Sequence, residues 1–224
     1  MELIILMVAI FLSASLLTET LGIWARVQGA FNDEPTTGYS THVRIATLGR
    51  FFILLSAPTL GYLVDSGVNN KQIAIIGILL FFIIFISILL FLKFGIKHFG
   101  KLYRFINRRK NIKDIEALLI PIYEVDKQFF IFVFISFTLT GTGVILVNYI
   151  ATLFPDLRAM IVQMAASVTM FGTLVHVFLI DPKLSQAADK NKKLLMEYII
   201  GFLYGRALSS LILVICFIGL YLYV

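Results

Sequence analysis

Long apolar stretches dominate this sequence, and they constrain its fold more than any other feature. Five stretches have the length of a membrane-crossing helix, which needs about 20 predominantly apolar residues. They are Leu3–Trp24, Ile73–Leu92, Phe129–Leu153, Met160–Ile180 and Leu194–Val224. A sixth stretch, residues 45–64, contains Arg50 and Pro58, but proline is tolerated in membrane helices where neighbouring protein satisfies the freed backbone groups. The pattern predicts an all-α membrane protein, a six-transmembrane helical bundle.

The composition supports this class and leaves little room for another. The chain is 59% hydrophobic and 14% charged, whereas a typical soluble domain is about half apolar and about a quarter charged. Six spans in 224 residues leave no separate soluble domain, so we expect a single transmembrane domain over 1–224. No Lys or Arg precedes the first stretch, which favours a retained span over a cleaved signal peptide. The one cysteine, Cys216, allows no disulfide framework.

Basic residues are distributed unevenly between the loops. Lys71 and Arg158 lie on one side of the predicted membrane, and fifteen others lie on the opposite side. The fifteen are Arg26, Arg44, Lys93, Lys97, Lys101, Arg104, Arg108, Arg109, Lys110, Lys113, Lys127, Lys183, Lys190, Lys192 and Lys193. Because cytoplasmic loops carry an excess of Lys and Arg, we expect a multi-pass plasma-membrane protein with three cytoplasmic basic loops and both termini outside. The net charge of +6 then indicates anionic membrane lipids as partners and no nucleic acid.

The longest basic loop, 93–128, begins with an amphipathic pattern. Lys97, Lys101 and Arg104 fall at helical spacing on one face, while Leu102 and Phe105 lie on another. This pattern predicts either a helix that lies on an anionic leaflet or a solvated continuation of the third span.

A weak internal repeat relates the two halves of the chain, 1–93 and 128–224, which the basic loop joins. The matching phrases are Leu17–Thr20 (LTET) with Leu139–Thr142 (LTGT), and Leu63–Asp65 (LVD) with Leu179–Asp181 (LID). With three spans in each half, the halves would be inverted, an arrangement that recurs in transporters. Chance similarity among sequences rich in Leu, Thr and Gly is the alternative.

Several charged residues fall inside the predicted spans, where each typically costs a few kcal/mol to insert. At helical rise, Glu19 lies roughly 9 Å and Arg206 roughly 16 Å from the cytoplasmic ends of their spans. Arg26 closes the first span, and Arg50 lies at a depth similar to that of Glu19. An arginine as deep as Arg206 must meet a carboxylate, carbonyls, water or an anionic ligand. Glu19 is the only carboxylate at a comparable depth.

The surplus of arginine over carboxylate predicts an anion site, because a guanidinium binds phosphate through two parallel N–H donors. A lipid-linked phosphate or diphosphate fits best, and we expect a lining rich in Trp and Phe. The residues assigned to substrate binding are Arg26, Arg50 and Arg206, and those assigned to charge balance or proton coupling are Glu19, Asp65, His176 and Asp181. Two structural alternatives remain: a buried ion pair between Glu19 and Arg206, and an Arg26 whose stem reaches the interface.

Enzymatic motifs are absent from the sequence. It contains no H-E-x-x-H, G-x-S-x-G or nucleotide-binding P-loop, and its three histidines have no metal-ligand spacing. We therefore expect no enzyme, no cofactor and no metal. An ion gradient, the membrane potential or consumption of the product would then drive any transport.

One run in the first span, Glu19–Gly29 (ETLGIWARVQG), resembles the first-span signature of the Amj family, the bacterial "alternate to MurJ" lipid II flippases. In that signature an acidic residue and Thr precede an Arg and a Gly at the same offsets. Pro58–Asp65, Leu179–Ser185 and the pair Gly205–Arg206 are also similar. The chain departs from the family pattern at Glu19, where the family has Asp, and at Ala207–Leu208, where it has Gly-Thr.

The resemblance implies a flippase that moves an undecaprenyl-diphosphate-linked cell-wall precursor, lipid II or a similar lipid-linked saccharide, from the inner to the outer leaflet. Cell-wall synthesis proteins would be its partners. Two other functions remain open: a membrane scaffold that recruits partners through the basic loop, and an intramembrane lipid-phosphate transferase. A groove lined by Arg50 and Arg206 would favour transport over the scaffold, and an acidic pair or divalent metal in it would favour the transferase.

Overall fold

The computed structural model describes residues 1–108 and 126–223. Within this part of the chain six helices are long and apolar enough to cross a membrane, which confirms the predicted all-α bundle. They are Glu2–Phe31, Pro35–Asp65, Asn70–Asn107, Lys127–Leu153, Pro155–Lys190 and Lys192–Tyr223. The second stretch is thus one long helix that continues through Pro58. The protein is a multi-pass membrane protein.

Three of the six spans are divided into shorter elements. The bounds are α1 (Glu2–Gly22) and α2 (Trp24–Phe31), α3 (Pro35–Asp65), α4 (Asn70–Leu90), the π-helical turn η1 (Phe91–Gly95) and α5 (Ile96–Asn107), α6 (Lys127–Leu153), the short helix η3 (Pro155–Leu157), α7 (Arg158–Val175), the π-helical turn η4 (His176–Ile180) and α8 (Asp181–Lys190), and α9 (Lys192–Tyr223). π-helical turns inside a helix often mark functional sites, and η4 separates α7 from α8.

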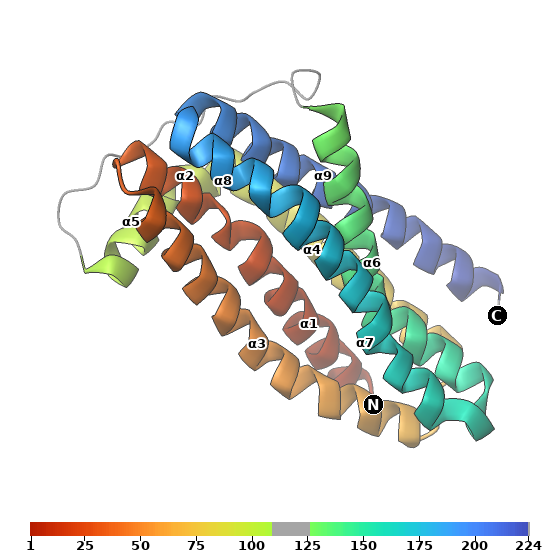
Figure 1. Ribbon diagram of the computed structural model, residues 1–224. Coiled ribbons are helices and arrows are strands. Elements are labelled where there is room, and N and C mark those ends of the chain that lie inside the picture. Colours follow the sequence, from red (N-terminus) through yellow and green to blue (C-terminus); the bar gives the residue numbers. More distant parts are fainter. Residues whose placement is uncertain (109–125, 224) are drawn as a thin grey trace.

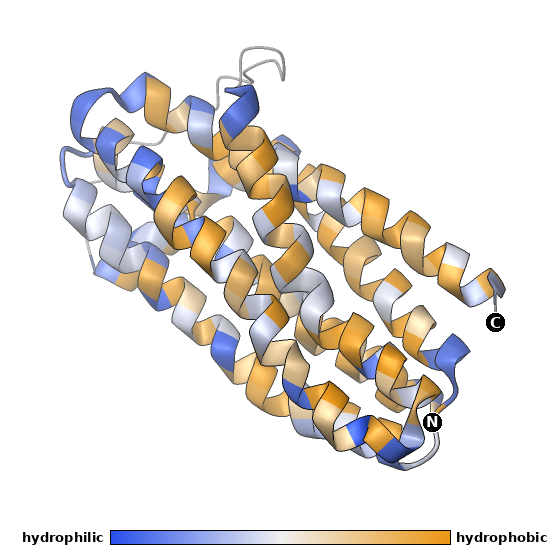
Figure 2. Ribbon diagram, turned by 45° about the vertical axis from the view of Figure 1, so that its right-hand side comes forward, coloured by the Kyte–Doolittle hydropathy of each residue, from blue (hydrophilic) through white to orange (hydrophobic). Residues whose placement is uncertain are grey.

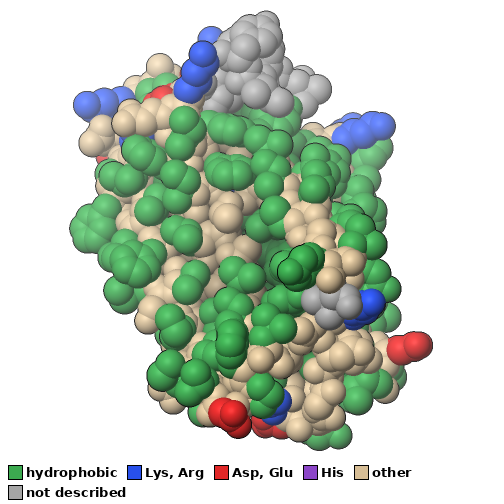
Figure 3. Space-filling model, turned by 90° about the vertical axis from the view of Figure 1, so that its right-hand side faces the viewer, with side chains coloured by type: hydrophobic (Ala, Val, Ile, Leu, Met, Phe, Trp, Pro, Cys, Tyr) green, Lys and Arg blue, Asp and Glu red, His purple; other side chains and the backbone are tan. Residues whose placement is uncertain are grey.

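Both termini lie at one end of the bundle, and α2, α5 and α8 lie at the other (Figure 1). Hydrophobic residues cover most of the length of the helices, while hydrophilic residues gather towards the ends (Figure 2). On the face shown in Figure 3, charged side chains likewise lie mainly near the top and bottom. Below, the inner end is the end with α2, α5 and α8, and the outer end is the end with the termini. These names follow the predicted orientation, which stays a prediction.

Local sequence signals set where the helices begin. Asn69 starts α4 with a capping box, in which its side chain accepts the N–H of Gln72 and the Gln72 side chain accepts the N–H of Asn69. Asp126 starts α6 by accepting the N–H groups of Gln128 and Phe129. Gly67 has a positive φ of 79°, so it allows the tight turn between α3 and α4.

The helices pack in the same way within each half of the chain. α1 packs against α3 and α4, and α6 packs against α7 and α9. Glycines allow close approach in both halves: Gly49 lies on Thr18 between α3 and α1, and Gly172 lies on Thr140 between α7 and α6. Across the halves, α4 packs extensively against α9, where Phe81 and Phe217 stack. The α4–α9 contact therefore joins the halves along one side of the bundle.

The basic loop begins as a helix packed on the bundle. After η1, α5 turns away from the line of α4 and runs across the inner end (Figure 1). Its Phe99 and Tyr103 are buried, and Phe105 is 82% exposed. α5 is therefore more than a solvated continuation of the third span, and its contact with an anionic leaflet stays a prediction. Arg109, Lys110 and Lys113 lie outside the described residues.

Candidate functional site

A cavity of about 350 Å³ lies between the two halves, and we call it the polar cavity. The first half supplies residues of α1, α2 and α3 to it, and the second half supplies residues of α6, α7, η4 and α8. The polar side chains that line it are Ser15, Glu19, Arg26, Tyr39, His42, Thr47, Arg50, Ser136, Thr140, Thr173, His176 and Asp181. Most of these side chains can donate or accept a hydrogen bond without a fixed charge, so the lining can exchange contacts with a polar ligand.

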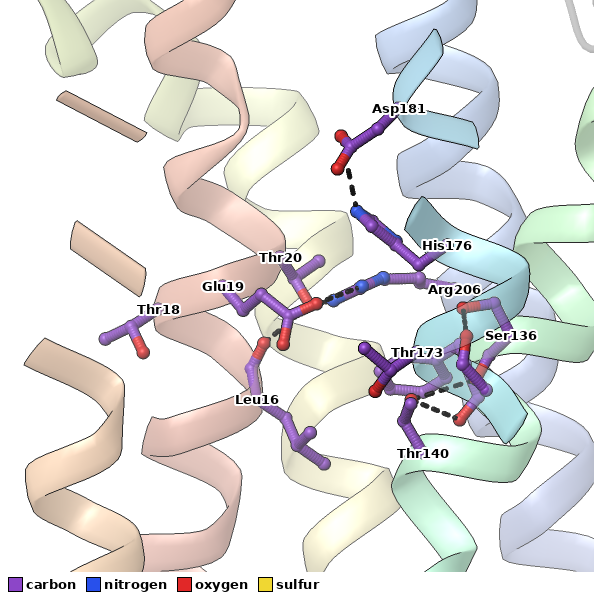
Figure 4. Close-up of polar contacts among 12 residues, drawn as sticks. Leu16, Thr18, Glu19, Thr20, Ser136, Thr140, Thr173, His176, Asp181 and Arg206 are labelled. Atoms are coloured by element: carbon purple, nitrogen blue, oxygen red, sulfur yellow. Dashed lines mark hydrogen bonds and ion pairs between the residues drawn. The ribbon is translucent and has the colours of Figure 1, made fainter. Parts of the chain in front are cut away.

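Glu19 and Arg206 face each other across this region (Figure 4). Arg206 donates from Nη2 to Glu19 Oε1 at 2.5 Å and from Nη1 to Thr20 Oγ1 at 2.7 Å. Its guanidinium also lies 5.0 Å from the Phe137 ring centroid and 4.3 Å from that of Phe202. The structure thus brings Glu19 and Arg206 together as an ion pair, which is one of the two alternatives that the sequence left open.

The two partners of this pair differ in exposure. The Arg206 side chain is 2% exposed, whereas the Glu19 side chain is 43% exposed and lines the polar cavity. Arg206 is not among the lining residues, because it lies behind Glu19. The contact is therefore an ion pair between a buried arginine and a glutamate that is exposed to the cavity. The predicted groove is lined by Arg50 but not by Arg206.

Arg26 organises a second group of charged side chains at the inner end of the cavity. Its Nη2 donates to Asp181 Oδ1 at 2.7 Å, and its Nε donates to His42 Nδ1 at 3.2 Å. His176 Nε2 lies 3.6 Å from the same Asp181 oxygen (Figure 4). A His42 nitrogen that accepts an N–H cannot carry a proton itself, so this hydrogen bond assigns a neutral imidazole with its proton on Nε2.

Two N–H groups in this cluster are buried and have no hydrogen-bond partner among the described residues. They belong to Arg26 Nη1 and His42 Nε2. Both side chains line the polar cavity and are less than a tenth exposed, at 4% and 6%. A buried donor left unpaired is unfavourable by roughly 1–3 kcal/mol, so these donors favour a ligand or water that can accept.

Arg50 is the unpaired cation of the cavity. It lines the cavity from α3, and it makes no hydrogen bond or ion pair with any residue in 1–108 or 126–223. Glu19 and Asp181 are already paired with Arg206 and Arg26. The positive charge of Arg50 is therefore not balanced by the lining, and the cavity attracts anions.

Two further cavities adjoin the polar cavity. An apolar cavity of about 350 Å³ shares Ser15, Glu19, Ile53, Thr140 and Thr173 with it. Its other lining residues are apolar except Thr169: Leu12, Leu16, Ala57, Leu80, Gly141, Val144 and Ile145. A cavity of about 220 Å³, the inner vestibule, shares Arg26 and Tyr39 with the polar cavity and includes residues of α8. From the inner end the cavities follow in the order inner vestibule, polar cavity and apolar cavity, so the polar cavity lies between the other two.

The structure does not bring all predicted site residues together. Asp65 lies at the outer end of α3, where Oδ1 is 3.4 Å from Arg158 Nη1 and the side chain is 77% exposed. The expected Trp- and Phe-rich lining is wrong: Trp24 is fully buried against Phe91, and among the described residues the polar lining contains Tyr39 but no Trp or Phe. Aromatic residues instead pack around the Arg206 guanidinium, which is already shielded from water.

Sequence reasoning found Arg50 but missed the rest of the contribution of α3 to the site. One face of α3 lines the polar cavity through Tyr39, His42, Val43, Ala46, Thr47, Arg50 and Ile53. These residues recur every three or four positions, which is the spacing of one helical face. That spacing of polar residues in an apolar segment was the available signal, and it would have added Tyr39 and His42 to Arg50.

A family model described as Alternate to MurJ, Amj, matches residues 88–198. The match confirms the resemblance to the Amj family. Of the cavity's charged residues, the Amj match contains His176 and Asp181, while Glu19, Arg26 and Arg50 precede it. No curated protein and no solved structure matches the chain. Within the described ranges, no cluster of three or more His, Cys, Asp or Glu side chains could hold a metal ion.

Proposed function

We propose that this protein is a flippase of the plasma membrane that moves an undecaprenyl-diphosphate-linked cell-wall precursor from the inner to the outer leaflet. The observation that carries the proposal is the unpaired Arg50 in a polar cavity that adjoins an apolar one. The Amj match supports the same class of function. Cell-wall synthesis enzymes would supply and consume the lipid.

The polar cavity offers the diphosphate positive charge and N–H donors in place of the hydration that it loses on leaving water. An ion stripped of hydration in an apolar medium is unfavourable by tens of kcal/mol in the ideal limit. Arg50 supplies an unneutralised guanidinium, and Arg26 and His42 supply buried N–H donors without partners. A cavity of about 350 Å³ suits the diphosphate group, and the saccharide would extend towards the inner vestibule.

The apolar cavity distinguishes a lipid from a soluble anion. It lies beside the diphosphate donors and is lined by aliphatic side chains of α1, α3, α4 and α6. A soluble phosphate would gain nothing from such a surface, whereas the first isoprene units of a polyprenyl chain would bury apolar area there. Cargo with a charged head and a branched apolar tail fits both cavities at once.

The paired charges would balance the head group during transport. Arrival of a diphosphate next to Glu19 adds negative charge beside a carboxylate, which favours either protonation of Glu19 or a shift of Arg206 towards the cargo. His176 and Asp181 can take part in the same balance because they share the lining with Glu19. We propose that Arg206 contacts diphosphate only when Glu19 releases it.

The direct test is transport by purified protein in liposomes without ATP. A lipid-diphosphate saccharide placed in one leaflet should reach the other, and Arg50→Ala should slow this by roughly tenfold or more, the worth of one hydrogen bond to a charged group. Lys101→Ala is the matched control, since Lys101 is exposed on α5 outside the cavity. If the wild type moves no such lipid, even with a proton or ion gradient imposed, the scaffold becomes the better explanation.

A further inference from the structure

Ion pairs join the halves of the chain at both ends of the bundle and between them. Glu19–Arg206 joins the halves within the bundle, and an exposed pair, Asp33–Lys192, joins them at the inner end. Two further pairs lie at opposite ends of the cavities. At the inner end, Arg26 of α2 pairs with Asp181 of α8 at 2.7 Å. At the outer end, Asp65 of α3 pairs with Arg158 of α7 at 3.4 Å. The polar and apolar cavities lie between these ends, on the side of the bundle away from the α4–α9 contact.

The four residues occupy similar but not equivalent places in the two halves. Arg26 lies in α2, near the end of the first span of its half, and Arg158 is the first residue of α7, just after the first span of the other half. Asp65 and Asp181 each follow the second apolar stretch of their half, in the phrases LVD and LID. Each ion pair therefore joins the arginine of one half to the terminal aspartate of the other. A two-fold rotation that exchanged inverted halves would bring the two aspartates to corresponding positions and each arginine to the same end of the bundle as the other, although not onto it.

We propose that these two ion pairs are the inner and outer gates of an alternating-access cycle. Opening one end breaks its pair while the other pair holds, and the halves rock about the α4–α9 contact. The inference rests on the proposed transport function and names the residues that close the site at each end.

The cavities show what the inner gate separates. Arg26 and Tyr39 line both the polar cavity and the inner vestibule, so they form the wall between them. The Arg26 guanidinium lies 4.8 Å from the Tyr39 ring centroid, and its other side is held by Asp181. Release of Asp181 would free Arg26 to swing and would join the two spaces. The cargo head could then enter from the inner side.

The two gates differ in strength because they differ in exposure. The inner side chains are 5% and 27% exposed, and the outer side chains are 28% and 77% exposed. Exposed ion pairs are weak, and neutralising the outer pair should change the open population at that end about two- to fivefold. Neutralising the buried inner pair should change the population by more than about tenfold, since it leaves a buried charge unpaired.

The test measures distances at both ends of the empty protein by pulsed electron paramagnetic resonance. Spin labels on Thr36→Cys and Ser185→Cys report the inner end, and labels on Ser66→Cys and Leu157→Cys report the outer end. All four positions are exposed, and Cys216 is replaced by Ser. Each label pair is measured alone, and the gate residues themselves are not labelled.

Asp181→Asn should shift the inner distances longer and leave the outer distances unchanged, and Asp65→Asn should do the reverse. The control is Asp156→Asn, which removes an acid two residues before Arg158 that makes no ion pair or hydrogen bond with any described residue. Exchanging the outer charges, Asp65→Arg with Arg158→Asp, should restore the short outer distances. Arg26→Gln gives a second, independent opening of the inner pair.

Three outcomes would overturn the gates: unchanged distances in both aspartate variants, lengthening of both ends together, or an equal outer shift with Asp156→Asn. None of these outcomes depends on cargo. If the wild type transports the lipid but the aspartate variants show no change in distance, the gates are refuted and the proposed function is not. Reciprocal shifts in a protein that moves no lipid-diphosphate saccharide would support the gates and refute the proposed cargo.

Discussion

Removing either charge of the Glu19–Arg206 pair should destabilise the protein, but by unequal amounts. Glu19→Gln leaves a guanidinium that is 2% exposed and has lost its counter-charge; its remaining contacts are neutral, namely the new amide oxygen, Thr20 and two phenylalanine rings. Arg206→Gln leaves a carboxylate that is 43% exposed and faces a cavity. A carboxylate can also take up a proton, whereas a guanidinium keeps its charge in proteins. The glutamate variant should therefore be the less stable one.

The size of the difference follows from burial. Stranding a buried charge is unfavourable by about 3–5 kcal/mol, and the two aromatic contacts offset part of this in Glu19→Gln. Losing a partly exposed pair and one hydroxyl contact should destabilise Arg206→Gln by about 1–2 kcal/mol. At roughly 2–4 °C per kcal/mol for a chain of this size, the two melting temperatures should differ by about 2–10 °C.

Thermal melting in one detergent measures all variants on one scale. The double variant Glu19→Gln/Arg206→Gln leaves no stranded charge, so it should melt above Glu19→Gln although it carries one more substitution. Asp156→Asn, an exposed acid in η3, is the control for loss of a carboxylate. The reasoning is refuted if Arg206→Gln melts below Glu19→Gln, or if the double variant melts no higher than Glu19→Gln.

Three further predictions concern orientation, a partly buried carboxyl and helix packing. In a cysteine-free background, single cysteines at Lys71 and Lys190 should react with an impermeant thiol reagent from opposite sides of the membrane; reaction from the same side would contradict the six-span orientation. Burial raises the pKa of the Asp126 carboxyl, but hydrogen bonds from a lysine of α8 and two backbone N–H groups outweigh burial and hold the pKa below its usual value. Such a group contributes stability above its unfolded pKa and loses it as the pH falls through the folded pKa, so melting curves of wild type and Asp126→Asn should converge below about pH 4. A Cβ added at Gly49 would lie 2.9 Å from a carbonyl oxygen of α1, whereas nothing lies within 4 Å of one added at Gly61. Gly49→Ala should therefore lower stability by about 1–3 kcal/mol, and Gly61→Ala should leave stability equal or higher. Denaturation of the two variants measures this difference.

The sequence was sufficient to predict what depends on position along a helix. The length of each apolar stretch determined the number of spans, and helical rise placed Glu19 and Arg206 at compatible depths. Their contact is found in the structure at 2.5 Å. Depth is predictable because it follows from residue number and a fixed rise of 1.5 Å per residue.

What the sequence could not give was the direction in which each side chain points around its helix. Spans that are apolar on all sides carry little periodicity, so no face is marked for the protein interior. Trp24 was therefore expected in the site, whereas it is buried in the core against Phe91. Arg26 was expected to contact the ligand or reach the interface, and its pairing with Asp181 required knowledge of how α2 meets α8.

The position of Asp65 relates the sequence repeat to the site. Asp65 and Asp181 were both assigned to charge balance or proton coupling, and they end the similar phrases LVD and LID. In inverted halves, equivalent residues lie at opposite ends of the membrane, and the two aspartates do lie at opposite ends, each paired with an arginine of the other half. A charged residue that recurs in both halves and lies away from the midplane therefore indicates two ion pairs, one at each end of the bundle. Only a residue near the two-fold axis, close to the midplane, could meet its equivalent within a single site.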